Sequence, residues 1–181
     1  WYEGEENTFY GCYAGAATNG DDDTDTFIGS YAGNSNTSGF ENTFVGFESG
    51  KANTTGSNNT FIGFQSGLSN KTGISNVFIG PSTGQLNISG NFNTFIGDYS
   101  GYNNTVSNNT FIGYGTGYYN TIGTYNTYLG TLAGQGQSGL STGSNNTFMG
   151  YYTGYSNTTG QYNTFFGSQA GLGNTTGYGN N

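Results

Sequence analysis

A five-residue motif, Asn-Thr-Phe-Ile-Gly, recurs along the whole chain at a nearly fixed interval. It is complete at positions 59–63, 93–97 and 109–113, and close variants begin at Asn7, Asp25, Asn42, Asn76, Asn126, Asn146 and Asn163. Successive copies are 17 residues apart in six of nine cases, and 18, 16 and 20 residues apart in the others. A fixed period of this kind is the signature of a repeat architecture, in which each unit buries its apolar face against its neighbours.

The residues within each repeat favour strands and turns over helices. Thr, Phe, Ile and Tyr prefer strands, whereas glycine, present 35 times, would cost a helix about 1 kcal/mol at each interior position. Gly and Asn between the apolar runs are typical of turns because they tolerate positive φ. The sequence therefore predicts an all-β fold, a rod-like β-solenoid (β-roll) of about ten 17-residue coils. We expect one repeat domain over residues 1–181, with an N-terminal segment at 1–6, repeats at 7–177 and a tail at 178–181.

Stacked coils align equivalent residues in columns, among them an aromatic column and an adjacent aliphatic one. Because neighbouring residues of a strand point to opposite faces, we expect Ile62, Ile79 and Ile96 to fill the interior opposite small residues such as Ser66. The aromatic column would then be buried between chains or between laterally packed rods. The alternative is a bend at the glycine that turns both columns inward and makes the aromatic column part of the core. The column comprises Phe27, Phe44, Phe61, Phe78, Phe95, Phe111, Phe148 and Phe165.

A further column consists of asparagines, which can hydrogen-bond from coil to coil along the axis. Several of them stand in Asn-x-Ser/Thr sequons at equivalent turns, and such positions are candidate N-glycosylation sites in an exported protein. The alternative is that Asn and Thr are simply abundant turn and ladder residues. The candidate glycosylation sites are Asn53, Asn70, Asn87, Asn157 and Asn174.

Charge and residue types exclude several classes of function. The chain has two lysines, no arginine, no histidine and a net charge of −8, so we predict no nucleic-acid partner. No apolar run approaches the roughly 18 residues of a membrane span, and we predict no membrane insertion. Without His or Arg there is no ready general base and no oxyanion clamp. We therefore predict that the chain is not an enzyme, has no catalytic residue and binds no cofactor.

The acidic run Asp21–Asp23 with Asp25 offers hard oxygen ligands of the kind that Ca²⁺ prefers. Its spacing matches no EF-hand loop, and we interpret it as a solvated charge run rather than a metal site. Cys12 is the single cysteine, so no disulfide can form within the chain.

The repeat Asn-Thr-Phe-Ile-Gly-x-x-(Ala/Ser/Thr)-Gly-x-x-Asn-x-Thr-Gly, seen at 59–73 and 163–177, resembles the repeats of bacterial and phage tail-fiber-domain-containing proteins. It is also similar to the head repeats of trimeric autotransporter adhesins, which form β-rolls. The resemblance extends over nearly the whole chain and implies a fibre or adhesin at the cell surface, outside the cell or on a virion.

The function that we predict is a structural or adhesive extracellular fibre subunit that assembles with copies of itself, end to end or side by side. Exposed tyrosines make surface glycans a second candidate partner: Tyr114, Tyr118, Tyr119, Tyr151, Tyr152 and Tyr155. An ice-binding solenoid is an alternative, because threonines also form a column: Thr8, Thr26, Thr43, Thr60, Thr94, Thr110, Thr127, Thr147 and Thr164.

Overall fold

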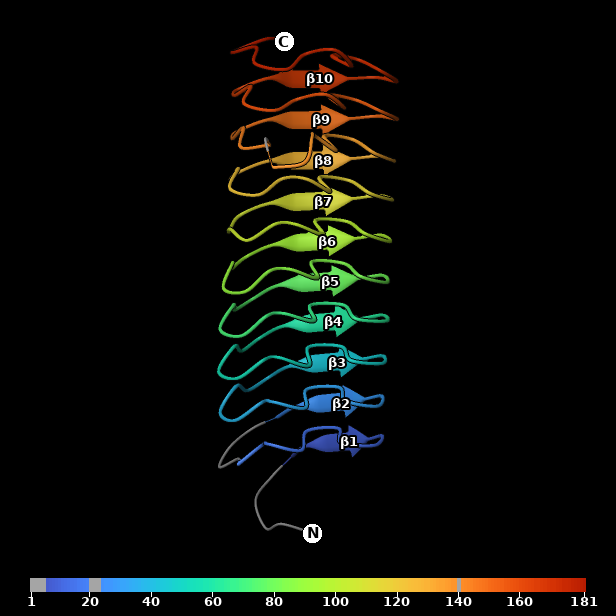
Figure 1. The fold of residues 1–181 in the computed structure, drawn as a ribbon, viewed down its shortest axis with the longest axis vertical. Coiled ribbons are helices and arrows are strands. Elements are labelled where there is room, and N and C mark those ends of the chain that lie inside the picture. The colour runs from blue at the N-terminus through green and yellow to red at the C-terminus, as the bar shows by residue number, and fades with distance from the viewer. Residues whose placement is uncertain (1–5, 20–23, 140) are drawn as a thin grey trace.

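The structure is a computed structural model that describes residues 6–19, 24–139 and 141–181. Its strands are each three residues long: β1 (Thr8–Tyr10), β2 (Thr26–Ile28), β3 (Thr43–Val45), β4 (Thr60–Ile62), β5 (Val77–Ile79), β6 (Thr94–Ile96), β7 (Thr110–Ile112), β8 (Thr127–Leu129), β9 (Thr147–Met149) and β10 (Thr164–Phe166). They form one parallel sheet in chain order, and the described residues contain no helix (Figure 1). Each strand belongs to one coil of a rod, so the prediction of a β-solenoid is confirmed.

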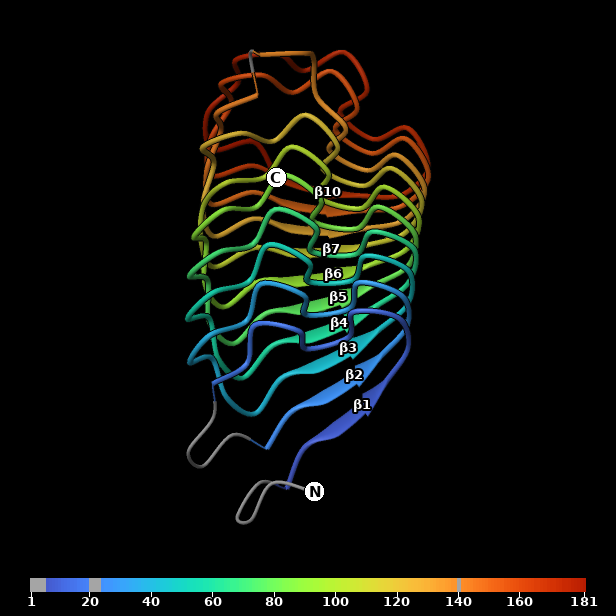
Figure 2. The same ribbon diagram turned by 60° about the horizontal axis from the view of Figure 1, so that its bottom comes forward.

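Equivalent residues of successive coils lie directly over one another. Between β3 and β4, for example, Thr43 pairs with Thr60 and Phe44 pairs with Phe61. The rings of Phe44 and Phe61 are parallel within 6°, with centroids 4.8 Å apart, which matches the usual spacing of hydrogen-bonded strands. Figure 2 shows the coils as similar closed loops, with the strands aligned along one wall. The repeat period of the sequence is thus the length of one coil.

The aromatic column fills the interior of a single chain, contrary to our expectation that it lies between chains. Phe27, Phe44, Phe61, Phe78, Phe95, Phe111 and Phe148 are all 0% exposed, and only the last member, Phe165, is partly exposed. The aliphatic column points outward instead: Ile62 is 37% exposed, and Ile79 and Ile96 are half-buried. The strand alternation was predicted correctly, but the assignment of the two faces was reversed.

The second glycine of the repeat explains why the aromatic ring points inward. Gly67 has a φ of +59°, and a Cβ placed on it would lie 2.5 Å from the ring of Phe61. The missing side chain thus leaves a flat slot that a phenyl ring fills and that the branched side chain of Ile62 does not. The first glycine, Gly63, has a φ of +137°, where L side chains are strained, and a Cβ placed on it would lie 2.6 Å from the carbonyl of Gly80 in the next coil.

The small residues lie inside the coil, as predicted. Ser66, Thr83 and Ser100 are 0% exposed. The Ser66 hydroxyl donates to the backbone carbonyl of Phe78 at 3.0 Å, so the column links adjacent coils as well as making room for the rings. A buried hydroxyl without such a partner would carry a desolvation cost.

Two asparagine ladders run along the rod, of which only one was predicted. In the expected ladder, Asn53 donates through its side-chain amide to the Asn36 Oδ1 atom at 2.8 Å, and Asn70 donates to Asn53 at 3.0 Å. The second ladder uses the first residue of each motif: the Asn59 Oδ1 atom accepts from the backbone N–H of Asn76 at 3.0 Å. The signal for it was present in the sequence, because the first position of the motif is almost always Asn.

Candidate functional site

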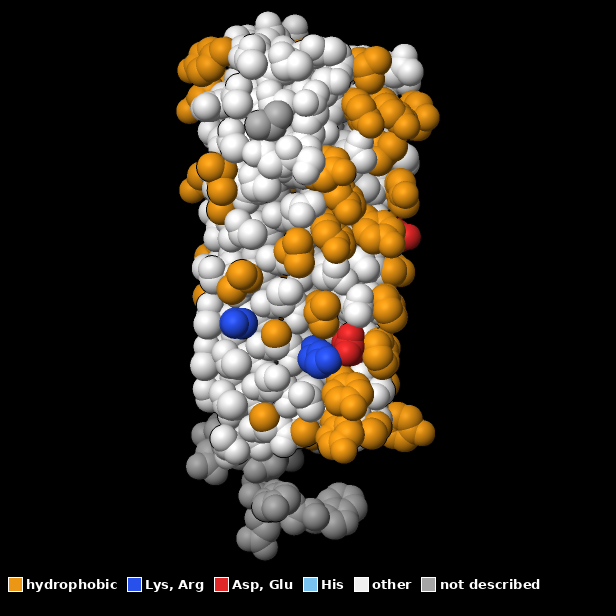
Figure 3. Space-filling model, in the orientation of Figure 1, with side chains coloured by type: hydrophobic (Ala, Val, Ile, Leu, Met, Phe, Trp, Pro, Cys, Tyr) orange, Lys and Arg blue, Asp and Glu red, His pale blue; other side chains and the backbone are white. Residues whose placement is uncertain are grey.

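Functional residues of this rod must lie on its outer surface, because rings, small residues and amides fill the interior. The outer surface has a sheet face, formed by β1–β10, and turns that connect each strand to the rest of its coil. Figure 3 shows hydrophobic side chains gathered along one long edge of the rod, with few charged side chains among them. The candidate residues predicted from the sequence are distributed between these surfaces and the interior.

The sheet face carries two parallel ranks of outward side chains, one of threonines and one of aliphatic residues. In β4, Thr60 and Ile62 both point outward, on either side of the buried Phe61. The threonine rank therefore lies on the outer surface, as the ice-binding hypothesis requires, but the rank beside it is aliphatic. Thermal hysteresis would test the hypothesis directly.

The candidate glycosylation sites belong to the buried asparagine ladder. Asn53, Asn70 and Asn87 are 0% exposed, and Asn157 is 4% exposed. Asn53 donates its side-chain amide to Asn36 and to the carbonyl of Gly56, so a glycan on this nitrogen is incompatible with the folded coil. Asn174 is partly exposed, but its amide also donates, to Asn157 at 3.3 Å. The ladder interpretation of these sequons therefore fits the structure, and the glycan interpretation does not.

Of the acidic candidate ligands, Asp21–Asp23 lie outside the described residues. Asp25 is described and fully buried. It takes the place of the first asparagine of a motif, and its carboxylate accepts from the backbone N–H of Asn42 at 2.7 Å and from the Asn36 amide at 2.9 Å. Elsewhere in the described parts of the chain, no three metal-binding side chains come together.

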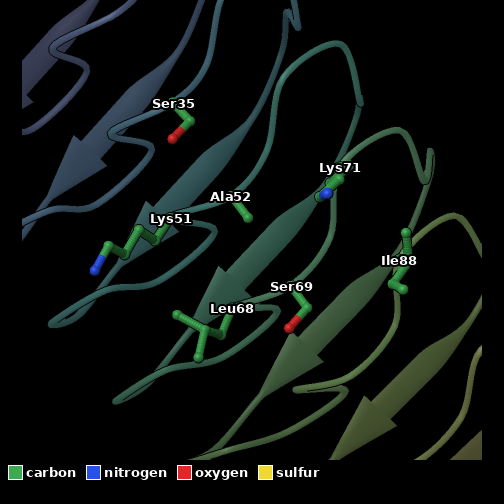
Figure 4. Close-up of a pocket in the computed structure, with 7 residues that line it drawn as sticks. All are labelled: Ser35, Lys51, Ala52, Leu68, Ser69, Lys71 and Ile88. Carbon is green, nitrogen blue, oxygen red and sulfur yellow. The ribbon is translucent and has the colours of Figure 1, made fainter.

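A shallow hollow of about 490 Å³ lies on the turns of neighbouring coils between β2 and β6 and is flanked by both lysines of the chain (Figure 4). It is lined by Ser35, Lys51, Ala52, Leu68, Ser69, Lys71 and Ile88. Figure 4 shows the Lys51 side chain extending away from Lys71. The Lys51 amine is already paired with Glu48, with a nitrogen-to-oxygen distance of 2.6 Å. The two amines therefore do not converge on a common ligand.

The turns after β3, β4 and β5 carry a chain of polar side chains, here called the polar chain. The Glu48 carboxylate accepts from Lys51 at 2.6 Å and from the Gln65 amide at 2.8 Å, and Gln85 donates to Gln65 at 2.8 Å and to Ser82 at 3.4 Å. The hydrogen bonds from Lys51 and Gln65 hold the pKa of Glu48 below its ordinary value of 4.5. Because its members bond to one another, the polar chain offers little to a ligand.

The same turns after β6 and β7 carry tyrosines instead, here called the tyrosine cluster: Tyr99, Tyr102, Tyr114, Tyr118 and Tyr119. The rings of Tyr102 and Tyr118 are parallel within 2° at a centroid distance of 5.0 Å. Tyr99 and Tyr114 are 38% and 52% exposed. The sequence predicted Tyr114, Tyr118 and Tyr119 as exposed platforms, but only Tyr114 is exposed, and the other two are half-buried. Tyr99 and Tyr102 were missed, although their positions in the repeat were the signal that would have found them.

Comparison with known proteins identifies no relative: no family model matches this chain, and neither a curated protein nor a solved structure does. The structure by itself identifies the chain as a parallel β-solenoid repeat protein. The part of the chain that the structure describes contains no helix with the length and apolarity needed to cross a membrane.

Proposed function

We propose that this chain is a structural and adhesive subunit of an extracellular fibre and that its rods stack end to end through the open edges of their outermost coils. The resemblance of its repeats to tail-fiber and adhesin-head repeats supports this proposal and favours the cell surface or a virion as its location. The observation that carries it is the pattern of backbone groups at the two ends of the sheet.

Inside the rod, each pair of coils is joined by backbone bonds that run in both directions. The N–H of Gly29 donates down to the carbonyl of Tyr10 in the preceding coil at 2.8 Å. The N–H of Gly15 donates up to the carbonyl of Ala32 in the following coil at 3.0 Å. Each coil therefore presents a complementary set of donors and acceptors on its two edges.

The outermost coils present the same set without a further coil in the described residues. The carbonyl of Phe166 and the N–H of Gly171 are the equivalents on the upper edge of the last coil, and the N–H of Gly11 and the carbonyl of Ala14 are those on the lower edge of the first. Exposed strand edges of this kind are templates for pairing with another chain. Docking of one rod on the next would restore the bonding pattern of the interior, as further coils of a longer chain would.

Stacking would also close the aromatic column. Phe9 at the lower end is 38% exposed and Phe165 at the upper end is partly exposed, whereas the phenylalanines of the column between them are 0% exposed. Placing Phe9 of one copy on Phe165 of another extends the ring stack and buries both. The apolar area removed from water adds a favourable term to the backbone bonds.

The final residues occupy the first position of the next layer. The backbone N–H and the side-chain amide of Asn180 donate to the Asn163 Oδ1 atom at 3.0 and 2.8 Å, as those of Asn163 do to Asn146 in the second ladder. An incoming copy whose Asn7 takes this position must displace residues 180–181. Stacking in this register therefore competes with residues 180–181 for the upper edge of the last coil.

Two lysines at the upper edge should shorten the fibres. We expect Thr175→Lys with Thr176→Lys to turn long fibres into short rods, measured by electron microscopy, because lysines on an exposed sheet edge hinder its pairing with another chain. The wild-type fibre should have an axial subunit repeat of about 45–55 Å, from ten to eleven coils. The matched control is Thr54→Lys with Thr55→Lys, at the same coil positions in mid-rod, where Lys71 already occupies one equivalent site. The wild type remaining as discrete short rods at high concentration would contradict the proposal.

A further inference from the structure

The tyrosine cluster is a continuous aromatic surface rather than a set of isolated rings. Tyr102 and Tyr118 form the parallel pair. The ring centroid of Tyr99 lies 5.8 Å from that of Tyr102 and 6.1 Å from that of Tyr118, with angles of 48° and 49° between the ring planes. The ring of Tyr114 packs edge-on against that of Tyr99, with centroids 6.5 Å apart and an interplanar angle of 87°. The ring of Tyr119 packs in the same way against that of Tyr118, at 4.6 Å and 73°. Five rings and five hydroxyls thus lie together on the turns of two adjacent coils.

The backbone holds this surface in place. The N–H of Tyr99 donates to the carbonyl of Pro81 at 3.0 Å, and the side-chain amide of Asn103 donates to the carbonyl of Tyr118 at 2.9 Å. The turns are therefore fixed to the coils on either side. A ligand that binds the rings does not have to order a loop, which lowers the entropic cost of binding.

The ring spacing excludes an aromatic cage around a cationic ligand. A cage for a quaternary ammonium group surrounds the cation with ring faces, each with its centroid within about 6 Å of the charge. Here Tyr102 and Tyr118 are already in van der Waals contact at 5.0 Å, and every other ring of the cluster contacts a neighbour. No gap is left between rings, so a ligand must lie on the outer surface of the cluster.

A carboxylate beside the rings adds a hydrogen-bond acceptor. Asp98 directly precedes Tyr99, and it occupies the same position of its coil as Tyr114 does in the next coil. The Asp98 residue is half-buried, and its Oδ1 atom is buried without a hydrogen-bond donor. Because the Oδ1 atom is enclosed, a ligand hydroxyl reaches it only after the Asp98 side chain rotates toward the surface, and that rotation relieves the cost of an unsatisfied carboxylate oxygen. In the polar chain, by contrast, both Glu48 oxygens already accept hydrogen bonds.

We infer that the tyrosine cluster with Asp98 is a binding site for a neutral oligosaccharide. The apolar face of a sugar ring packs on the tyrosines, and sugar hydroxyls donate to Asp98 and exchange hydrogen bonds with the tyrosine hydroxyls. An uncharged, hydroxyl-rich ligand suits a surface that offers aromatic area and an acceptor but no cation. This inference gives a ligand class to the adhesive part of the proposed function and is independent of end-to-end stacking.

The test is titration of the wild-type chain with three soluble hexasaccharides, of β-1,4-linked glucose, β-1,3-linked glucose and β-1,4-linked N-acetylglucosamine, by isothermal calorimetry. We expect at least one of them to bind. Tyr102→Ala with Tyr118→Ala should abolish that binding, and Asp98→Asn should weaken it about tenfold, because a hydrogen bond to a charged group is lost. Circular dichroism and the thermal midpoint verify that each variant is folded.

The matched control is Tyr13→Ala with Tyr31→Ala, which removes a stacked pair of tyrosines, with ring centroids 5.2 Å apart, from the equivalent turns after β1 and β2. We expect this variant to bind like the wild type. Equal loss of binding in the control, or no binding of any hexasaccharide at millimolar concentration, would overturn the assignment. It would also be overturned if the Tyr102 and Tyr118 variant lost only side-by-side association of rods, since the cluster would then be a contact between copies. Fibre length, measured for the same variants, reports separately on the stacking proposal.

Discussion

The polar chain and the tyrosine cluster occupy equivalent turns of the same rod, yet they present opposite surfaces. Gln65 in the first and Tyr99 in the second stand at the same coil position and share a left-handed backbone, with φ of 54° and 56°. One donates and accepts hydrogen bonds along the rod, whereas the other packs against rings. The backbone of the coil thus does not depend on the residue that this position carries.

The interior explains this independence. Beneath both turns lies the same arrangement of a buried phenylalanine, a buried hydroxyl and two buried asparagines, as Phe61 and Ser66 show in one coil and Phe111 and Thr116 in another. Interior contacts fix the coil path, and the left-handed turn residues accept a strain of about 1–2 kcal/mol each. The turns are therefore free to differ between coils, and differences in binding are expected there.

The largest effect on stability is expected from the buried phenylalanines, which the two regions have in common. Phe61→Ala below the polar chain and Phe111→Ala below the tyrosine cluster each remove a ring stacked between two others. We expect each to lower the free energy of unfolding by about 3–5 kcal/mol, through lost burial and a cavity. Urea denaturation followed by circular dichroism measures both. A clearly smaller cost at Phe111 would mean that the surface turn, and not the shared interior, sets the stability of that coil.

A second prediction separates the regions at alkaline pH. Burial, followed by the neighbouring tyrosines, raises the pKa of Tyr118 above its ordinary value of 10.0, and burial raises the pKa of the interior Tyr128 much further. Both groups therefore bind their protons more tightly in the folded chain, and stability is lost as the pH rises above about 10. We expect the thermal midpoint to fall between pH 9 and 11. Tyr128→Phe should remove the larger part of this fall and Tyr118→Phe a smaller part, and an unchanged slope in both variants would refute the explanation.

The smallest effect on stability is expected in the polar chain, where the contribution of Glu48 is lost at acid pH. The pKa of Glu48 is lowered by the hydrogen bonds from Lys51 and Gln65, so its contribution is complete above pH 4.5 and is lost as the pH falls through the folded-state value. Because the pair lies at the surface, we expect Glu48→Gln to cost less than about 1 kcal/mol at pH 7. The difference from wild type in urea midpoint should shrink at pH 3. A difference that persisted there would point to packing rather than charge.

The repeat period of the sequence by itself determined most of the fold. Copies of the Asn-Thr-Phe-Ile-Gly motif predicted the coils, their length, the parallel stacking and the alternation of inward and outward residues. They also predicted the small interior column and the ladder through Asn53 and Asn70. The second ladder was missed, although the first residue of each motif was plain in the sequence, because we interpreted that residue only as a turn former.

What the sequence could not decide is which of two adjacent apolar columns faces inward. Alternation requires Phe61 and Ile62 to point to opposite sides, but it does not say which side is the interior. Only the coil geometry decides, because the bare Cα of Gly67 lies six residues after Phe61 and opens a slot that fits a flat ring. The tyrosine cluster has the same origin: its five members come from two coils, and only stacking brings Tyr102 and Tyr118 to 5.0 Å from each other. Local sequence sets the coil, whereas contacts between coils set the interior and the candidate binding surface.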